Sequence, residues 1–238
     1  MSFSTVHQHQ LDRGLVWSGF KQLLPISLFV TVFGAAYGLA ASQVGVDDSI
    51  TLAMSALVFS GYAQFALLDM WGTTVPLVPM CIAALAINAR HLLMGATLYP
   101  WLQRLSPVKR YGVMVIASDA NWAMAINAFE RGKPGFGLLV GGGLAIWAFW
   151  VVGTWIGVCF GGLVENPERY GLDMVMGCFL VAMAVGGGVK IRSFAIWAAA
   201  AISSLAAYHY LPEHSHIVVG TLCGGIVGVF LAGDSNEH

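Results

Sequence analysis

Long apolar runs separated by short polar breaks constrain this sequence more than any other feature. Several runs reach the ~20 residues that an α-helix needs to cross about 30 Å of hydrocarbon. Backbone groups cannot stay unpaired in lipid, and continuous runs lack the alternation of membrane β-strands. We therefore predict an all-α, polytopic integral membrane helical bundle of about eight hydrophobic segments: Leu23–Ala41, Ile50–Trp71, Val75–Tyr99, Gly112–Phe129, Phe136–Phe160, Leu172–Val189, Ser193–Tyr210 and Ile217–Ala232.

The composition agrees with a chain embedded in a lipid bilayer. Hydrophobic residues make up 58% of the sequence and charged residues only 10%, whereas soluble domains carry about 25% charged residues. The formal net charge of −1 gives no basic surface for nucleic acid. The first 21 residues are polar and irregular, so we expect no cleavable signal peptide and expect the first apolar segment to direct insertion.

The four cysteines carry no pattern that predicts a metal centre or a disulfide. All of them lie inside apolar segments, and no pair has Cys-x-x-Cys spacing. Buried thiols of this kind behave as small hydrophobic side chains. We predict no metal and no cofactor; the cysteines are Cys81, Cys159, Cys178 and Cys223.

Positive charges predict the orientation of the chain, because cytoplasmic loops collect Lys and Arg. Arg13 and Lys21 place the N-terminus in the cytoplasm, and Lys190 and Arg192 place the C-terminus there too. The acidic loop Glu165–Asp173 and the loop with Asp47 and Asp48 then lie outside.

One basic cluster conflicts with eight simple crossings. If every segment crosses, then Arg104, Lys109 and Arg110 lie outside, against the rule. If Val75–Tyr99 and Gly112–Phe129 are hairpins that enter and return, the cluster stays inside. Both segments have polar residues at their middles, and broken helices are tolerated where they line a protein cavity. We expect at least one broken or re-entrant segment and leave the number of crossings open.

Glycines recur at four-residue spacing in three segments, which places them on one helix face. Small residues at this spacing let helix backbones approach closely. Packing within the chain is the ordinary explanation, and an interface in a higher oligomer is the alternative. The helix-packing candidates are Gly34, Gly38, Gly153, Gly157, Gly161, Gly220, Gly224 and Gly228.

Polar residues in the middle of apolar segments are the candidate functional residues, because an ionisable group at membrane depth is costly. Arg90 follows Asn88 deep in its segment and must find an anion, either a carboxylate such as Asp119 or the carboxylate of a substrate. His91 can carry a proton near neutral pH or can be a structural hydrogen-bonding residue. Asp119 can carry a proton or a cation. Asp69, beside Trp71, reads as a residue at the membrane surface.

A stretch of small residues contains the remaining candidate, Gln64. The run Phe59-Ser60-Gly61-Tyr62-Ala63-Gln64-Phe65 places an amide in mid-segment. Small residues with an amide suit a backbone exposed to a ligand, and they equally suit tight helix packing.

This stretch, together with Ile87-Asn88-Ala89-Arg90-His91-Leu92-Leu93-Met94-Gly95, resembles the AzlC family, the large subunits of bacterial branched-chain amino-acid exporters. Pro25 in the first segment and Asp119 in the fourth also fit. The resemblance implies export of branched-chain or similar apolar amino acids across the bacterial inner membrane, driven by the proton gradient, with a small AzlD-type membrane subunit as partner. It implies that Gln64, Asn88, Arg90, His91 and Asp119 bind the substrate or couple transport to the ion.

The chain departs from the family pattern at two places. Ala120 stands where relatives carry an acidic residue after the Asp, and Gly177-Cys178 stands where many carry a proline. We divide the chain into a cytoplasmic or interfacial segment (1–22), a single transmembrane transporter domain (23–232) and a short tail (233–238).

Other function classes find less support in the residues. An intramembrane protease would need a Gly-x-Ser-Gly or His-Glu-x-x-His motif, and the sequence contains neither, so we predict no enzyme. A haem protein would need paired ligands deep in facing segments, and only His91 is deep. A passive channel or a permease for another small polar solute remains the alternative to a carrier, because both are lined by a few polar groups.

Overall fold

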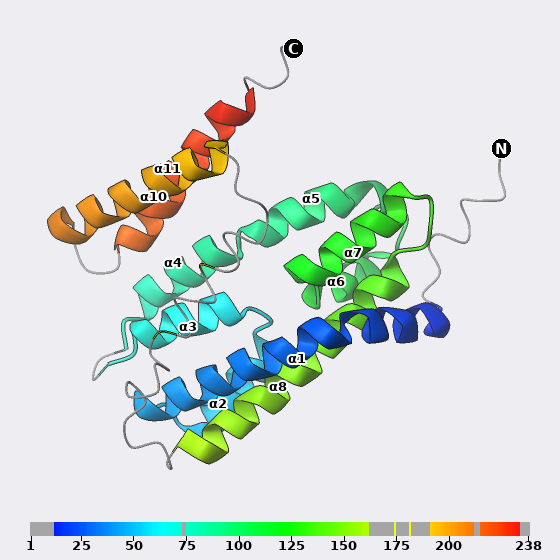
Figure 1. Ribbon diagram of the computed structural model, residues 1–238, viewed down its shortest axis with the longest axis horizontal. Helices are drawn as coiled ribbons and strands as arrows, with labels where there is room; N and C mark the ends of the chain where they lie inside the picture. The colour runs from blue at the N-terminus through cyan, green and yellow to red at the C-terminus, as the bar shows by residue number, and fades with distance from the viewer. Residues whose placement is uncertain are drawn as a thin grey trace. The chain divides into compact units, whose positions relative to one another are not determined.

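The computed structural model describes residues 12–72, 75–161, 174, 181, 191–211 and 215–233. These ranges contain helices and no strand, which confirms the all-α prediction. The predicted segment Leu172–Val189, apart from Met174 and Val181, lies outside them, as do Glu165–Asp173 and Lys190. Figure 1 shows the helices: α1 (Arg13–Gln43), α2 (Asp48–Leu57), α3 (Gly61–Asp69), α4 (Leu77–Asn88), α5 (Arg90–Leu102), α6 (Pro107–Val115), α7 (Asp119–Glu130), α8 (Phe136–Gly161), α10 (Ile191–Tyr210) and α11 (Ser215–Gly233).

The chain groups into two compact units. Unit 1 comprises Met1–Leu68 and Asn88–Met176, and unit 2 comprises Asp69–Ile87 and Gly177–His238. All five candidate substrate or coupling residues belong to unit 1. The division into one transporter domain with short terminal segments stays a prediction.

Close backbone contact joins α1 to α8, the two longest helices of unit 1 (Figure 1). A Cβ at Gly34 would come within 2.6 Å of the Trp150 carbonyl oxygen, and one at Gly161 within 2.8 Å of the Ser42 side chain. Gly38, Gly153 and Gly157 lie against the facing backbone in the same way. Because the contact face is made of glycine, the two helices approach more closely than larger residues would allow.

In unit 2 the glycines of α11 face α10. A Cβ at Gly220 would lie 3.0 Å from the Ser204 side chain, and one at Gly224 would lie 3.0 Å from that of Ala200. Gly228 has more room, since its nearest neighbour, Ile196 Cδ1, would be 3.5 Å away. These glycines lie in an interface within the chain.

Two of the predicted apolar segments are each divided into two helices by non-helical residues, which confirms that at least one segment is broken. The segment Ile50–Trp71 is α2 and α3 with residues 58–60 between them, and Gly112–Phe129 contains a break at residues 116–118. Only Ala89 separates α4 from α5, and its dihedral angles (φ −55°, ψ −25°) are helical. The helix Leu77–Leu102 is therefore 26 residues long, enough to cross a membrane.

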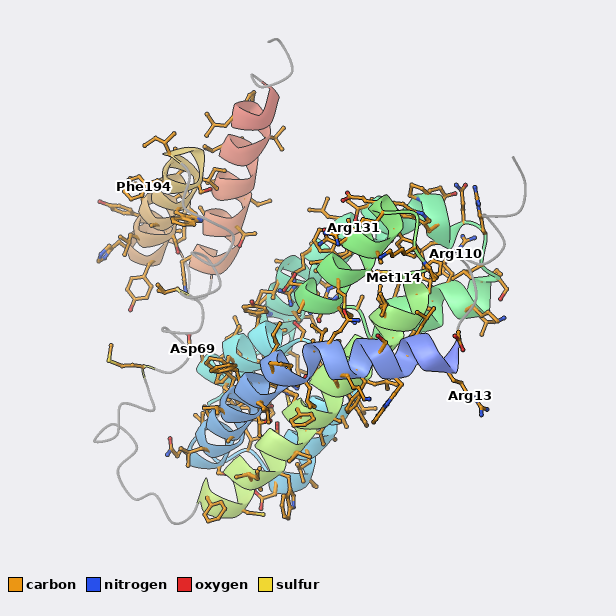
Figure 2. The ribbon with its side chains drawn as sticks, turned by 45° about the vertical axis from the view of Figure 1, so that its right-hand side comes forward. Arg13, Asp69, Arg110, Met114, Arg131 and Phe194 are labelled. Atoms are coloured by element: carbon orange, nitrogen blue, oxygen red, sulfur yellow. The ribbon has the colours of Figure 1, made fainter. Side chains whose placement is uncertain are left out.

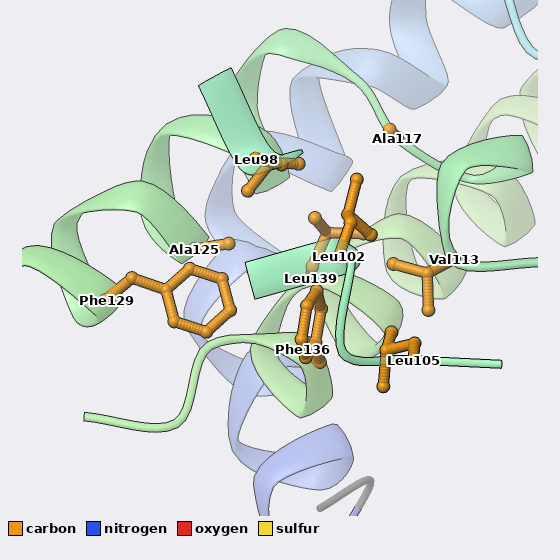
Figure 3. Packing of buried hydrophobic residues seen from close by; sticks show 9 residues of the cluster. All are labelled: Leu98, Leu102, Leu105, Val113, Ala117, Ala125, Phe129, Phe136 and Leu139. Carbon is orange, nitrogen blue, oxygen red and sulfur yellow. The ribbon is translucent and has the colours of Figure 1, made fainter. Parts of the chain in front are cut away.

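The helices α6 and α7 form a hairpin that returns to the end of unit 1 where it began. Trp101, near the end of α5, stacks on Phe129, near the end of α7, with ring centroids 4.6 Å apart. Phe129 also contacts Phe136 at the start of α8, at 4.9 Å. Figure 3 shows the apolar cluster that holds this end together: Leu98, Leu102, Leu105, Val113, Ala117, Ala125, Phe129, Phe136 and Leu139. The start of α6 and the end of α7 thus lie at the same end of unit 1.

Basic residues gather at the same end of unit 1, where Figure 2 shows Arg13 and Arg110. Arg110 donates hydrogen bonds to the carbonyl oxygens of Leu102 (3.2 Å), Gln103 (3.2 Å) and Leu105 (3.4 Å), which ties the start of α6 to the end of α5.

Acidic residues begin α2 after the far end of α1. The Asp47 side chain caps α2 by accepting from the Ser49 amide at 2.8 Å. Hydrogen bonds from the Ser49 hydroxyl, the Ser49 amide and the Ile50 amide lower the pKa of Asp47. Basic and acidic groups therefore sit at opposite ends of α1.

Apolar side chains cover the outside of unit 1 as a lipid-facing surface requires. On α1, Leu28, Phe29 and Val32 are 58%, 69% and 63% exposed. Within the described residues, α1, Leu77–Leu102 and α8 are long and apolar enough to cross a membrane.

Candidate functional site

The first turns of two helices meet at one guanidinium group. Arg90 lies in the middle of the helix Leu77–Leu102, Asp119 is the first residue of α7, and Tyr62 is the second of α3. Arg90 Nη1 lies 2.8 Å from Asp119 Oδ2, and the Arg90 guanidinium carbon lies 4.3 Å from the centre of the Tyr62 ring. The N-terminal ends of α3 and α7, which carry the positive ends of the helix dipoles, therefore meet at Arg90 in unit 1.

The electrostatics of the three residues are complementary. Asp119 stands at the start of α7, where the helix dipole favours an anion, and Arg90 supplies the cation that pairs with it. The Asp119 carboxylate and the face of the Tyr62 ring together compensate the positive charge of Arg90. The side chains of Arg90 and Asp119 are 28% and 40% exposed, so water or a solute can reach them.

The ion pair leaves the Nε–H of Arg90 available as a hydrogen-bond donor. This Nε atom is buried and has no hydrogen-bond partner among the described residues. Both alternatives from the sequence, a structural pair and a substrate contact, are therefore chemically available to Arg90.

His91 links the helix Leu77–Leu102 to the break between α6 and α7 through backbone oxygens. Its Nδ1 lies 3.2 Å from the Asn88 carbonyl oxygen, and its Nε2 lies 3.2 Å from the Ala117 carbonyl oxygen. A neutral imidazole donates from one nitrogen only, whereas the imidazolium donates from both. The arrangement therefore offers an acceptor to each ring nitrogen.

Asn121 holds the α6–α7 break against α8. It is fully buried and donates from Nδ2 to the carbonyl oxygens of Ile116 (2.7 Å) and Leu139 (2.8 Å). Its Oδ1 accepts from the Ser118 amide at 2.6 Å. The sequence analysis did not assign this role, although a Ser followed three residues later by a polar side chain signals a helix start.

Gln64 lies on α3, two residues after Tyr62, and its side chain is fully buried. Neither Oε1 nor Nε2 has a hydrogen-bond partner among the described residues. Ser60 Oγ and Trp150 Nε1 share this property with Gln64 and with Arg90 Nε. Trp150 lies in the middle of the long apolar segment that forms α8, where nothing in the sequence indicates a functional residue.

Four of the five candidates form two contacting pairs that are adjacent through the Arg90–His91 peptide. Arg90 contacts Asp119, and His91 contacts the Asn88 carbonyl oxygen. Gln64 is linked to them through α3 and the Tyr62 ring. Asp69, read as a surface residue, is the last residue of α3. Within the described part of the chain, no group of three or more His, Cys, Asp or Glu side chains is placed to hold a metal ion.

The family relationship follows from comparison with known proteins. The model of the family described as AzlC protein matches residues 25–164. The chain belongs to the AzlC family. The matched region runs from α1 to just beyond α8 and contains all five candidate residues.

Two curated relatives match most of the chain. A Bacillus subtilis (strain 168) protein named "Branched-chain amino acid transport protein AzlC" is 25% identical over 80% of this chain and 76% of its own length. An "Uncharacterized membrane protein" of Archaeoglobus fulgidus is 25% identical over 94% of this chain and 95% of its own. No solved structure is significantly similar. The chain is thus a multi-pass membrane protein, and its family identifies it as a membrane transporter.

Proposed function

We propose that this AzlC protein is a secondary-active exporter of branched-chain or similar apolar amino acids. We place it in the bacterial inner membrane, driven by the proton gradient and acting with a small AzlD-type membrane subunit rather than catalysing a reaction. The printed name of the Bacillus subtilis relative supports the substrate class. The proton coupling and the AzlD-type partner subunit are proposed because the resemblance to the AzlC family implies them.

The meeting of two helix starts, those of α3 and α7, at the Arg90–Asp119 pair is the observation that carries this proposal. Secondary transporters bind their substrates at broken helices, whose N-terminal ends face anionic groups of the substrate. An amino acid brings a carboxylate for such an end and an aliphatic side chain for the apolar surroundings. Broken helices also provide joints at which a site can open to one side at a time.

An efflux assay tests the proposed function directly. Cells that lack the gene are fed dipeptides containing valine, leucine, isoleucine or methionine, and intracellular and external amino acids are measured over time. We expect the deletion strain to accumulate the amino acid and plasmid expression to restore efflux, most strongly together with the AzlD-type subunit. Saturable, gradient-dependent efflux supports a carrier over a channel. Unchanged accumulation for all four residues would contradict the proposed substrate class.

We further propose a topology that places both termini in the cytoplasm. With α2–α3 and α6–α7 as re-entrant pairs, only α1, Leu77–Leu102 and α8 cross among the described helices of residues 12–161. An inside N-terminus then places Arg104, Lys109, Arg110, Arg131 and Lys133 in the cytoplasm and Asp47 and Asp48 outside. This arrangement removes the conflict with the positive-inside rule that eight simple crossings create.

Cysteine labelling tests this topology in a variant whose four native cysteines are replaced by serine. We expect Asp48→Cys to react with a membrane-impermeant maleimide in intact cells. Arg104→Cys and Arg131→Cys should react only after permeabilisation, because their loops face the cytoplasm. Each position is exposed in the structure, so failure to react reports sidedness. Labelling of Arg104→Cys from outside would overturn the re-entrant assignment.

A further inference from the structure

Three buried polar groups without partners gather at the start of α3. Ser60 precedes the helix, Gln64 lies in its first turns, and Trp150 comes from α8. Their exposed fractions are 6%, 0% and 9%. Ser60 Oγ, both amide atoms of Gln64 and Trp150 Nε1 lack hydrogen-bond partners among the described residues. Buried polar groups are normally paired, so these groups are available to a partner that the described residues do not supply.

The geometry of α3 brings these groups to one place. The backbone N–H of Gln64 donates to the backbone carbonyl oxygen of Ser60 at 3.1 Å, so the two residues are one turn apart on one helix face. Helical side chains lean toward the helix N-terminus, which directs the Gln64 amide back toward Ser60. The Trp150 ring covers Gly61, where a Cβ would come within 2.8 Å of Trp150 Cη2.

The chemistry of the cluster fits a carboxylate. The Ser60 hydroxyl, the Gln64 amide and the Trp150 indole supply three N–H or O–H donors. The first-turn amides of a helix have no acceptor within their own helix and carry its positive end. Anions bind at helix N-termini for this reason, here with three buried side-chain donors beside the backbone.

We propose that the α2–α3 break, with Ser60, Gln64 and Trp150, binds the carboxylate of the transported amino acid. This subsite rests on the proposed function. The Arg90 guanidinium is the competing anion site, but Asp119 already compensates its charge at 2.8 Å. Because the three groups are at most 9% exposed, the break opens to admit the substrate.

An aromatic cluster beside the break suits the other end of the substrate. The rings of Tyr37 and Trp150 stack at 5.9 Å, and Phe65 contacts them at 5.6 Å and 6.4 Å. An aliphatic side chain that extends from the carboxylate subsite therefore meets apolar ring surface instead of polar groups.

Gln64→Leu tests the subsite, since leucine has a similar size but no amide. Binding of L-leucine and of L-leucinamide, which lacks the carboxylate, is measured by calorimetry on the full-length protein in nanodiscs. We expect the affinity for L-leucine to fall at least tenfold and that for L-leucinamide to change less than twofold. The midpoint of thermal unfolding should stay equal or rise, because the variant removes a buried unpartnered amide.

Two further variants separate binding from folding. Asn127→Leu is the matched control, because Asn127 is an exposed amide on α7 that bonds within its own helix at 2.9 Å. It should leave both affinities unchanged. Ser60→Ala removes a second donor with little change in volume, and should weaken L-leucine binding severalfold even if Gln64→Leu fails to fold. If folded Gln64→Leu and Ser60→Ala both bind L-leucine like the wild type, the groups hold only water and the subsite is wrong.

A separate experiment tests the carboxylate subsite if the proposed export function is wrong. If the wild type exports no branched-chain amino acid, the subsite is tested with 4-methylpentanoate against 4-methylpentanamide. Stabilisation by the acid alone, lost in Gln64→Leu, supports a carboxylate site for another solute. No difference between acid and amide in the wild type overturns the carboxylate subsite itself.

Discussion

Replacing Arg90 or Asp119 singly is expected to reduce leucine export at least tenfold and to destabilise the protein, whereas replacing both restores most of the stability. Arg90→Gln leaves the Asp119 carboxylate without its cation, and Asp119→Asn leaves the guanidinium without its anion. A charge left unpaired in a desolvated environment costs more than the pair contributes. The double variant Arg90→Gln, Asp119→Asn removes both charges together.

A double-mutant cycle on the free energy of unfolding in detergent micelles measures this coupling. We expect an interaction energy of about 0.5–3 kcal/mol, the range found for residues in direct contact. The partial exposure of both side chains argues against a value at the upper limit. Additive single-variant effects would show that the pair does not join α5 to α7.

Substrate affinity in the same variants separates the two roles left open for Arg90. If Arg90 mainly joins the half-helices, the folded double variant should bind L-leucine with nearly wild-type affinity while exporting it slowly. A tenfold loss of affinity in the double variant, with none in Gln64→Leu, would assign the substrate carboxylate to Arg90. The two anion sites therefore make opposite predictions for one measurement.

The sequence predicted the membrane architecture well, because lipid imposes a strong constraint on composition. A helix such as α8 needs a long apolar run, and its glycines need a close neighbour, so both are visible without coordinates. The polar residues near Arg90 and Asp119 were equally visible, because charge within an apolar run is rare. What the sequence left open was whether Arg90 meets a protein carboxylate, and the 2.8 Å contact with Asp119 answers that question.

The α2–α3 break was harder to predict, because hydropathy does not change there. Val58 and Phe59 are as apolar as the helices they separate, so the run Ile50–Trp71 reads as one span. Asn121 and Trp150 act through contacts with distant parts of unit 1, and tertiary contacts of this kind leave no local pattern. The contact between the ends of α5 and α7 likewise depends on Trp101 stacking on Phe129.

Replacing His91 with glutamine is expected to abolish pH-driven export while sparing exchange. The ring nitrogens face the carbonyl oxygens of Asn88 and Ala117, each at 3.2 Å. Only the imidazolium form of a histidine donates from both ring nitrogens. A proton carried by His91 would therefore add a hydrogen bond between the helix Leu77–Leu102 and the α6–α7 break.

Few other ionisable groups face His91 from the helices around it. Arg90 on α5 and Asp119 on α7 are paired with each other. On α6, Lys109, Arg110 and Tyr111 occupy the first turns at the basic end, and Glu130 ends α7 there. The helix α8 has no Asp, Glu, Lys, Arg or His. His91 is the one histidine of α5, α6, α7 and α8, and histidine is the side chain that most often carries protons in proteins.

Proteoliposomes with an imposed pH gradient distinguish coupling from transport. We expect His91→Gln to lose at least tenfold of gradient-driven leucine accumulation while leucine exchange stays within about threefold of the wild type, because glutamine supplies a donor but binds no proton. The wild-type exchange rate should change across pH 5 to 8, and that of His91→Gln should not. His209→Gln, at an exposed position on α10, is the control. Retained gradient-driven accumulation in His91→Gln would assign the coupling proton to another group, and Asp119 would be the next candidate because its carboxylate is partly exposed at the same convergence of helix ends.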